Sequence, residues 1–74
     1  MSRSNQYLTP REQEVLAFLT VGKTNREIAA GLGVSVSTVK CHLRSIYEKL
    51  GVSNRTEAAI AGLRIIPILR ALAS

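Results

Sequence analysis

Apolar residues recur along most of this 74-residue chain at intervals of three and four, which is the spacing of one face of an α-helix. Four segments carry this spacing, and each follows a Ser, Thr or Asn that can cap a helix N-terminus. Val and Ile keep the same helical period rather than the alternation that marks a strand. The pattern predicts an all-α fold, a four-helix bundle-like domain without strands.

Capping residues mark where each helix begins, and glycines mark where most of them end. The capping pairs are Thr9 with Glu12, Thr24 with Glu27, and Asn54 with Glu57, while Ser35 or Ser37 caps the third helix. The predicted helices run from Pro10 to Thr20 or Val21, over about 25–31, over about 36–50 and from about Arg55 onward. Gly22 and Gly51 end the first and third helices. Gly31 and Gly33 mark a tight turn in which a positive φ is expected, and Pro67 kinks or ends the last helix, with one further turn open to it.

The third predicted helix divides most clearly into two faces. Its apolar stripe consists of Val36, Val39, Leu43, Ile46, Tyr47 and Leu50. Its other face carries Ser37, Lys40, Cys41, Arg44 and Glu48. The stripe packs this helix on the first two, so that Lys40 and Arg44, one turn apart, project outward. The short second helix, the glycine turn and this longer helix form a helix-turn-helix pattern.

A helix with an exposed basic face is suited to double-stranded DNA. It fits the major groove, where basic side chains can read guanine O6 and N7. Ser37 and Cys41 are small enough to let the helix approach closely. Cap hydroxyls and exposed helix N-terminal amides suit phosphate contacts. The segment at about 36–50 is therefore predicted to be a recognition helix in the major groove.

Composition and charge agree with a polyanionic partner and exclude most other classes. Ten Lys and Arg against five Asp and Glu give a net charge of +5 and a pI near 10.2. One Cys, one His and no Asp leave no disulfide, no metal site and no catalytic set, so we expect neither an enzyme nor a cofactor. Residues 1–7 are predicted to be a flexible leader to a domain at 8–74. No signal peptide or membrane span is evident, which favours a cytoplasmic location.

The fourth predicted helix is apolar nearly all round, and a chain this small cannot bury so much apolar surface in its own core. A chain with so small a core can need a second copy to stabilise it. A membrane-surface role for residues 65–73 is a weaker alternative, since the helix has no broad basic face.

Four blocks of sequence, in order, resemble one known family. They are L-T-P-R-E-x-E-V-L at 8–16, G-K-T-N-R-E-I-A at 22–29, V-S-x-x-T-V-K-x-H-L at 34–43 and K-L-G-V-x-N-R-T-E-A at 49–58. Together they are very similar to the LuxR-type (GerE-like) helix-turn-helix DNA-binding domain of bacterial transcription regulators. The resemblance implies a sequence-specific regulator of double-stranded DNA, dimeric through the fourth helix, on an inverted-repeat operator. Most relatives carry an additional N-terminal domain, so a stand-alone regulator and an excised C-terminal domain both stay open.

The resemblance also implies roles for individual residues. Base contacts are expected from Lys40, Cys41 and Arg44. Phosphate contacts are expected from Thr24, Ser35, Ser37, Thr38, His42, Lys49, Asn54 and Arg55. The expected dimer interface comprises Ala58, Ala61, Gly62, Ile65, Ile66 and Leu69. For Lys49 and Arg55 an ordinary solvated surface charge is an equal alternative, and for Cys41 a thymine-methyl or packing contact is favoured over a redox sensor.

Two other functions fit part of the sequence. A sigma-factor region-4-like domain also resembles L-x-x-R-E-x-E-V-L followed by E-I-A and T-V-K, but it usually lacks the block at 49–58. A protein-interaction module would use the fourth helix on a partner such as RNA polymerase and bind DNA only weakly. Replacing Lys40 and Arg44 by alanine separates a DNA-binding regulator from an interaction module. The regulator would lose DNA affinity and keep its dimer, whereas the interaction module would lose neither.

Overall fold

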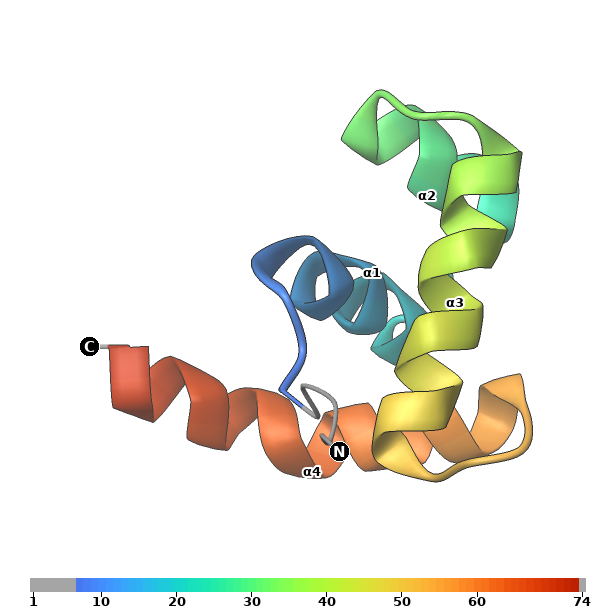
Figure 1. Ribbon diagram of the computed structural model, residues 1–74. Coiled ribbons are helices and arrows are strands. Elements are labelled where there is room, and N and C mark those ends of the chain that lie inside the picture. The colour runs from blue at the N-terminus through green and yellow to red at the C-terminus, as the bar shows by residue number, and fades with distance from the viewer. Residues whose placement is uncertain (1–6, 74) are drawn as a thin grey trace.

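The structure is a computed structural model that describes residues 7–73, and it is all-helical over this range (Figure 1). The helices are α1 (Pro10–Thr20), α2 (Asn25–Leu32), α3 (Val36–Leu50) and α4 (Arg55–Ala73). α1 contacts both α3 and α4, and α2 packs on α3. Figure 1 shows α3 running from α2 at one end to α4 at the other, with α1 in the angle between them. The predicted fold class and helix order are confirmed, and residues 1–6 of the expected leader lie outside the described range.

Reciprocal hydrogen bonds fix the starts of α1 and α2, as the capping pairs predict. Thr9 Oγ1 accepts from the backbone N–H of Glu12 at 3.1 Å, and Glu12 Oε1 accepts from that of Thr9 at 2.9 Å. Thr24 and Glu27 repeat the arrangement at α2. At α3 the cap is Ser35, whose hydroxyl accepts from a backbone N–H, rather than Ser37.

The two glycines of the predicted turn do different things. Gly33 lies at the end of α2 with φ of +70°, the left-handed conformation that favours glycine, and it turns the chain toward α3. Gly31 does not adopt a positive φ, so that expectation is wrong for it. It is helical, and a Cβ built there would lie 3.1 Å from the Phe18 ring. Gly31 therefore serves the close packing of α2 on α1.

The core lies where α1 meets the other three helices. Its buried apolar side chains are Val15, Leu16, Leu19, Ile28, Ala29, Val39, Leu43, Ile46 and Ala58. Gly62 allows α4 to approach α1, because a Cβ at this position would lie 2.8 Å from Thr20 Cγ2. Ala58 is fully buried, and Gly62 is buried as well. Both face the inside of their own protomer, which corrects the expectation that they contact a second chain.

Helix α4 continues through Pro67 to Ala73 instead of ending at the proline. The missing N–H of Pro67 removes one internal hydrogen bond, a loss that a helix tolerates at some cost. The continued helix extends beyond α1 (Figure 1), and its last turns carry the exposed side chains of Ile68 and Leu72.

Candidate nucleic-acid interface

The polar face of α3 predicted from the sequence is exposed in the structure. Its residues are Ser37, Lys40, Cys41, Arg44 and Glu48, and each is exposed. The opposite residues Val39, Leu43 and Ile46 are buried against α1 and α2. Packing therefore fixes the rotation of α3 about its axis and presents to solvent one long polar stripe that carries two cations and one carboxylate.

Lys40 and Arg44 are available for an external anion. Among the described residues the ion pairs are Arg11 with Glu14 and Glu12 with Lys49, and neither involves these two cations. No hydrogen bond within the described range uses them either. Since α3 places them one turn apart, their charged groups project on the same side of the helix. This pair can meet base edges or phosphates without first breaking an internal contact.

The hydroxyls expected to contact phosphate lie at the beginnings of α2 and α3, and three of them also serve as helix caps or their partners. Thr24 accepts from the backbone of Glu27, and the backbone N–H of Thr24 in turn lowers the pKa of that carboxyl. Ser35 accepts from the backbone N–H of Thr38, and their two hydroxyls lie 2.9 Å apart. Ser37 is exposed beside them, while His42 is half-buried farther along α3.

A buried ion pair joins α1 to α3 and occupies one of the expected phosphate-binding residues. Lys49 Nζ lies 2.8 Å from Glu12 Oε1, and the side chains are only 18% and 6% exposed. Lys49 also donates to the backbone carbonyl of Tyr7 at 3.1 Å, and Ser45 donates to Glu12 Oε2 at 2.6 Å. The ammonium group of Lys49 is therefore engaged inside the domain, a role that the sequence did not indicate.

The charge of Glu12 is stabilised strongly by these neighbours. Burial alone would raise the pKa of this carboxyl. Hydrogen bonds from Lys49 and Ser45, the backbone N–H of Thr9 and the charge of Lys49 outweigh that effect and lower the pKa from 4.5 to about 2. Glu12 is therefore both a helix cap and the residue whose ion pair and hydrogen bond hold α3 on α1.

Arg55 also has an internal role. Its guanidinium donates to Asn25 Oδ1 at 2.6 Å and to the backbone carbonyl of Lys23. These bonds tie the first residue of α4 to the start of α2, so Arg55 is not simply a solvated surface charge. Asn54 caps α4 by accepting from the backbone N–H of Glu57 at 2.9 Å. Both residues thus set how α4 joins the helix-turn-helix.

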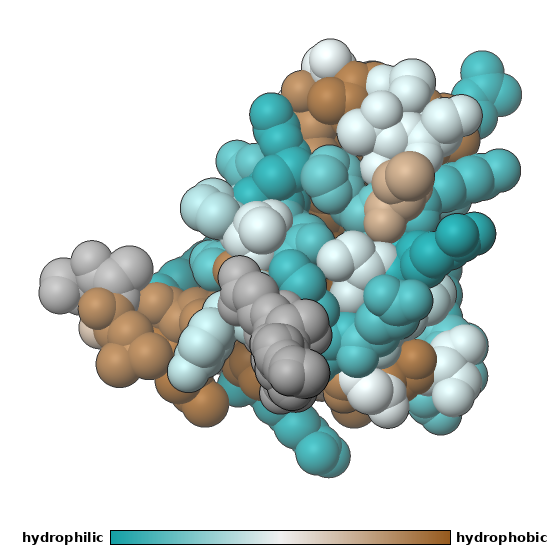
Figure 2. Space-filling view, viewed as in Figure 1, coloured by the Kyte–Doolittle hydropathy of each residue, from teal (hydrophilic) through white to brown (hydrophobic). Residues whose placement is uncertain are grey.

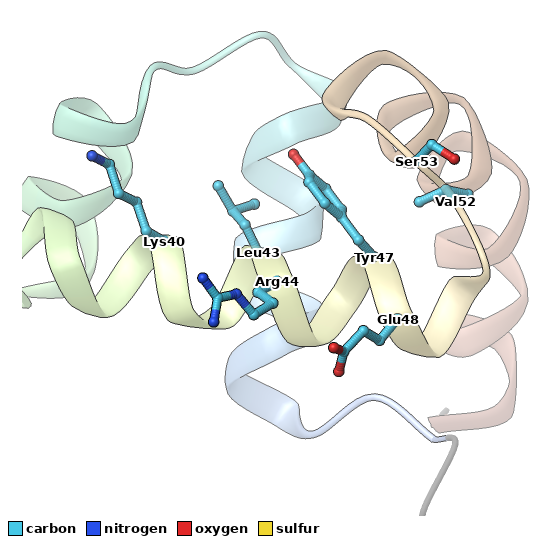
Figure 3. A pocket seen from close by; sticks show the side chains of 7 residues that line it. All are labelled: Lys40, Leu43, Arg44, Tyr47, Glu48, Val52 and Ser53. Atoms are coloured by element: carbon cyan, nitrogen blue, oxygen red, sulfur yellow. The ribbon is translucent and has the colours of Figure 1, made fainter.

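A groove runs along the flank of α3 and was not foreseen from the sequence (Figure 3). It has a volume of about 480 Å³ and is lined by Lys40, Leu43, Arg44, Tyr47, Glu48, Val52 and Ser53. Tyr47 was assigned to the core by its helical spacing, and its ring does pack there. It is nevertheless only half-buried. Periodicity alone could not show that its hydroxyl reaches this groove.

The exposed apolar surface of α4 differs from the one expected. Ala61, Ile65, Ile66 and Leu69 are half-buried, with Ile65 and Ile66 packed against the core. The large apolar side chains that are exposed on α4 are Ile60, Leu63, Ile68 and Leu72. Figure 2 shows apolar side chains gathering over the C-terminal part of this helix. A second chain would therefore meet mainly the outward residues.

Two searches of the described residues gave negative results. No cluster of three or more His, Cys, Asp or Glu side chains in this part of the chain could hold a metal ion. Over the same range, none of the helices combines the length and the apolar character that crossing a membrane requires.

Comparison with known proteins gives one consistent family. The family model for bacterial regulatory proteins of the luxR family matches residues 6–61. The probable transcriptional regulatory protein SgaR of Hyphomicrobium methylovorum is 59% identical over 51 residues, which are 69% of this chain and 24% of that protein. The transcriptional activator protein EsaR of Pantoea stewartii subsp. stewartii is 45% identical over 64 residues, 86% of this chain and 26% of that protein.

A solved structure shares the fold as well as the sequence. The crystal structure of the response regulator ChrA of a heme-sensing two-component system superposes with a TM-score of 0.78 at 48% identity. The match covers 86% of this chain and 32% of that one. The present chain thus spans about a quarter of the length of the two regulators above.

Proposed function

Because the chain belongs to the luxR family of bacterial regulatory proteins, we propose that it is a sequence-specific double-stranded DNA-binding domain of a transcription regulator and not an enzyme. The observation that carries this proposal is the pair of cations, Lys40 and Arg44, exposed on the outward face of α3 and without a partner among residues 7–73. The proposed site of action is the cytoplasm, where bacterial DNA lies.

In the proposed complex α3 occupies the major groove. Its 15 residues form a rod of about 22 Å, long enough to cross the groove while its N-terminal half meets base edges. Lys40 and Arg44 contact bases, with Cys41 between them against an apolar edge such as a thymine methyl. Phosphate contacts come from Thr24, Ser35, Ser37, Thr38, His42 and Asn54. Lys49 and Arg55 act indirectly, by holding α3 and α4 in place.

Binding to a mixed-sequence duplex is expected to weaken steeply with salt. Each phosphate that a Lys or Arg neutralises releases counterions, so the logarithm of the affinity falls linearly with the logarithm of salt concentration, by about 0.9 per phosphate. Fluorescence anisotropy of a labelled duplex over a range of salt concentrations measures this slope. Affinity that does not change with salt would contradict the phosphate contacts.

We also propose that the domain dimerises through the outward face of α4. Ile60 and Leu63 are 49% and 62% exposed and lie one turn apart, with Pro67 one turn farther on. A two-fold dimer would set two recognition helices on half-sites of an inverted repeat, about one helical turn of DNA apart. RNA polymerase is a further candidate partner for apolar surface that the dimer leaves uncovered.

Replacing Leu63 by glutamate is expected to weaken self-association without unfolding the domain, because the side chain is exposed and a buried charge at an interface is costly. Sedimentation equilibrium and a thermal melt measure the two effects. Val21→Glu, which changes an exposed apolar residue outside α4, is the matched control. Unchanged association in Leu63→Glu would contradict an interface on this face.

An interaction module that binds DNA only weakly is the second candidate, and the exposed apolar residues of α4 are the observation that favours it. It predicts that the Lys40 and Arg44 variants retain the affinity of the unchanged domain. The sigma-factor alternative is not supported, because the family model that matches is that of the luxR regulators.

A further inference from the structure

We propose that the groove on the flank of α3 seats a phosphate of the DNA backbone, and that the hydroxyls of Tyr47 and Ser53 bind it together with Lys40. This inference rests on the proposed DNA-binding function and adds two contact residues to it. Neither residue belongs to the outward stripe of α3 or to the helix caps.

The groove brings together groups from two segments of the chain. Lys40, Leu43 and Tyr47 line it from α3, and Val52 and Ser53 line it from the connection to α4. Figure 3 shows the Tyr47 hydroxyl and the Lys40 ammonium pointing to the same side of α3. In that view the Glu48 carboxylate points to the opposite side of the helix, and the Arg44 side chain lies across α3 in the direction of Lys40. The groove therefore has two hydroxyls and two cations, Lys40 and Arg44, along its lining, and the Glu48 carboxylate points away from the Tyr47 hydroxyl.

The donors of the groove have no partner inside the described part of the chain. Neither the Tyr47 hydroxyl nor Ser53 Oγ forms a hydrogen bond there, although the backbone N–H of Ser53 donates to Glu57. Lys40 is likewise unpaired within that range. Two hydroxyls and an ammonium group along one groove are donors that suit the acceptor oxygens of a phosphate.

The position of the groove favours the DNA backbone over a separate small anion. A helix that reads bases from the major groove has a sugar-phosphate strand on each flank, and phosphate contacts fix its register. Lys40 belongs both to the outward stripe and to the groove, so the two surfaces are continuous. A strand that passes from the stripe along this flank meets Tyr47 and then Ser53.

The ring of Tyr47 and its hydroxyl have separable roles. The ring packs against the core, whereas the hydroxyl lines the groove. Phenylalanine would therefore keep the packing and remove only the donor. This makes Tyr47→Phe a probe of the phosphate contact that leaves the fold unchanged.

Tyr47→Phe is expected to weaken binding to a mixed-sequence duplex by about three- to tenfold, the loss typical of one hydrogen bond to a charged group. The loss should be similar for every sequence, because a phosphate contact carries no base information. Ser53→Ala, at an exposed position, is expected to weaken binding in the same way. Tyr7→Phe changes the only other tyrosine of the chain and is the control.

Glu48 provides an independent arm of the test. Glu48→Gln is expected to tighten binding about two- to fivefold, since it removes a negative charge at the edge of the groove. Glu14→Gln makes the same change of charge on α1 and should have a smaller effect.

The outcomes separate this inference from the proposed function. If the unchanged domain binds duplex DNA but Tyr47→Phe and Ser53→Ala bind as tightly as Tyr7→Phe, the phosphate seat is overturned and DNA binding stands. If the unchanged domain binds no duplex at all, the proposed function itself fails. Weaker DNA binding in both variants, with unaltered thermal melts, supports the proposed phosphate contact in the groove.

Discussion

Replacing Lys40 and Arg44 together by alanine is expected to lower DNA affinity by at least about 30-fold while leaving the four helices folded. Each basic side chain that reads a guanine edge contributes about 1–3 kcal/mol of discrimination, so the pair accounts for much of the specific binding. Both side chains are exposed and make no internal contact within the described residues, so their removal should not affect stability. Circular dichroism and a duplex titration measure the two quantities.

The control for this pair must remove the same charge elsewhere. Arg11→Ala with Arg70→Ala lowers the net charge equally, at positions on α1 and at the end of α4. It should change affinity by much less and leave sequence preference intact. If the control pair loses as much affinity as Lys40→Ala with Arg44→Ala, binding depends on net charge alone and α3 is not the recognition helix.

Replacing Lys49 by methionine is expected to destabilise the domain by about 3–5 kcal/mol, because the carboxylate of Glu12 then stays buried without its counter-charge. The side chain of methionine keeps most of the packing volume, so the effect reports the charge. Adding Glu12→Gln should restore part of the stability, since the uncompensated charge is gone. Urea unfolding of the two single variants and the double variant measures the coupling. Additive losses in the double variant would show that the two groups do not interact.

The same ion pair predicts how stability depends on acid. The folded state holds the pKa of Glu12 at about 2, below its ordinary value of 4.5. The stabilisation that ionised Glu12 gives the folded domain is therefore fully present above about pH 4.5 and is lost as the pH falls toward 2. A depression of this size corresponds to about 3 kcal/mol. In Glu12→Gln the loss of stability across this range should be smaller by roughly that amount.

The helices themselves were predictable because their signals are local. Thr9, Thr24 and Gly51 act within a few residues of their positions in the chain, and the structure uses each as expected. The second role of Glu12 was not predictable, because its partners Ser45 and Lys49 lie 33 and 37 residues away. In the sequence, the capping box with Thr9 is already a sufficient reason for a glutamate at position 12. The sequence therefore contains no sign that Glu12 also has a partner on another helix.

The dimer residues show a different limit. When apolar residues surround a helix on nearly all sides, their spacing does not show which side of the helix faces the core. Ala58 and Gly62 were therefore assigned to an interface although they face α1. The α3 stripe, in contrast, has one apolar and one polar side, and its orientation was predicted correctly. Only the outward residues of α4, such as Leu63, keep a proposed role in assembly.

The most direct test of the account is selection of bound duplexes from a random DNA library at near-physiological salt. The account predicts enrichment of an inverted repeat whose half-sites lie about one helical turn apart, with a guanine preference that is lost in Arg44→Ala. Binding without any enriched sequence would contradict base recognition by α3 and leave only the electrostatic contribution to affinity.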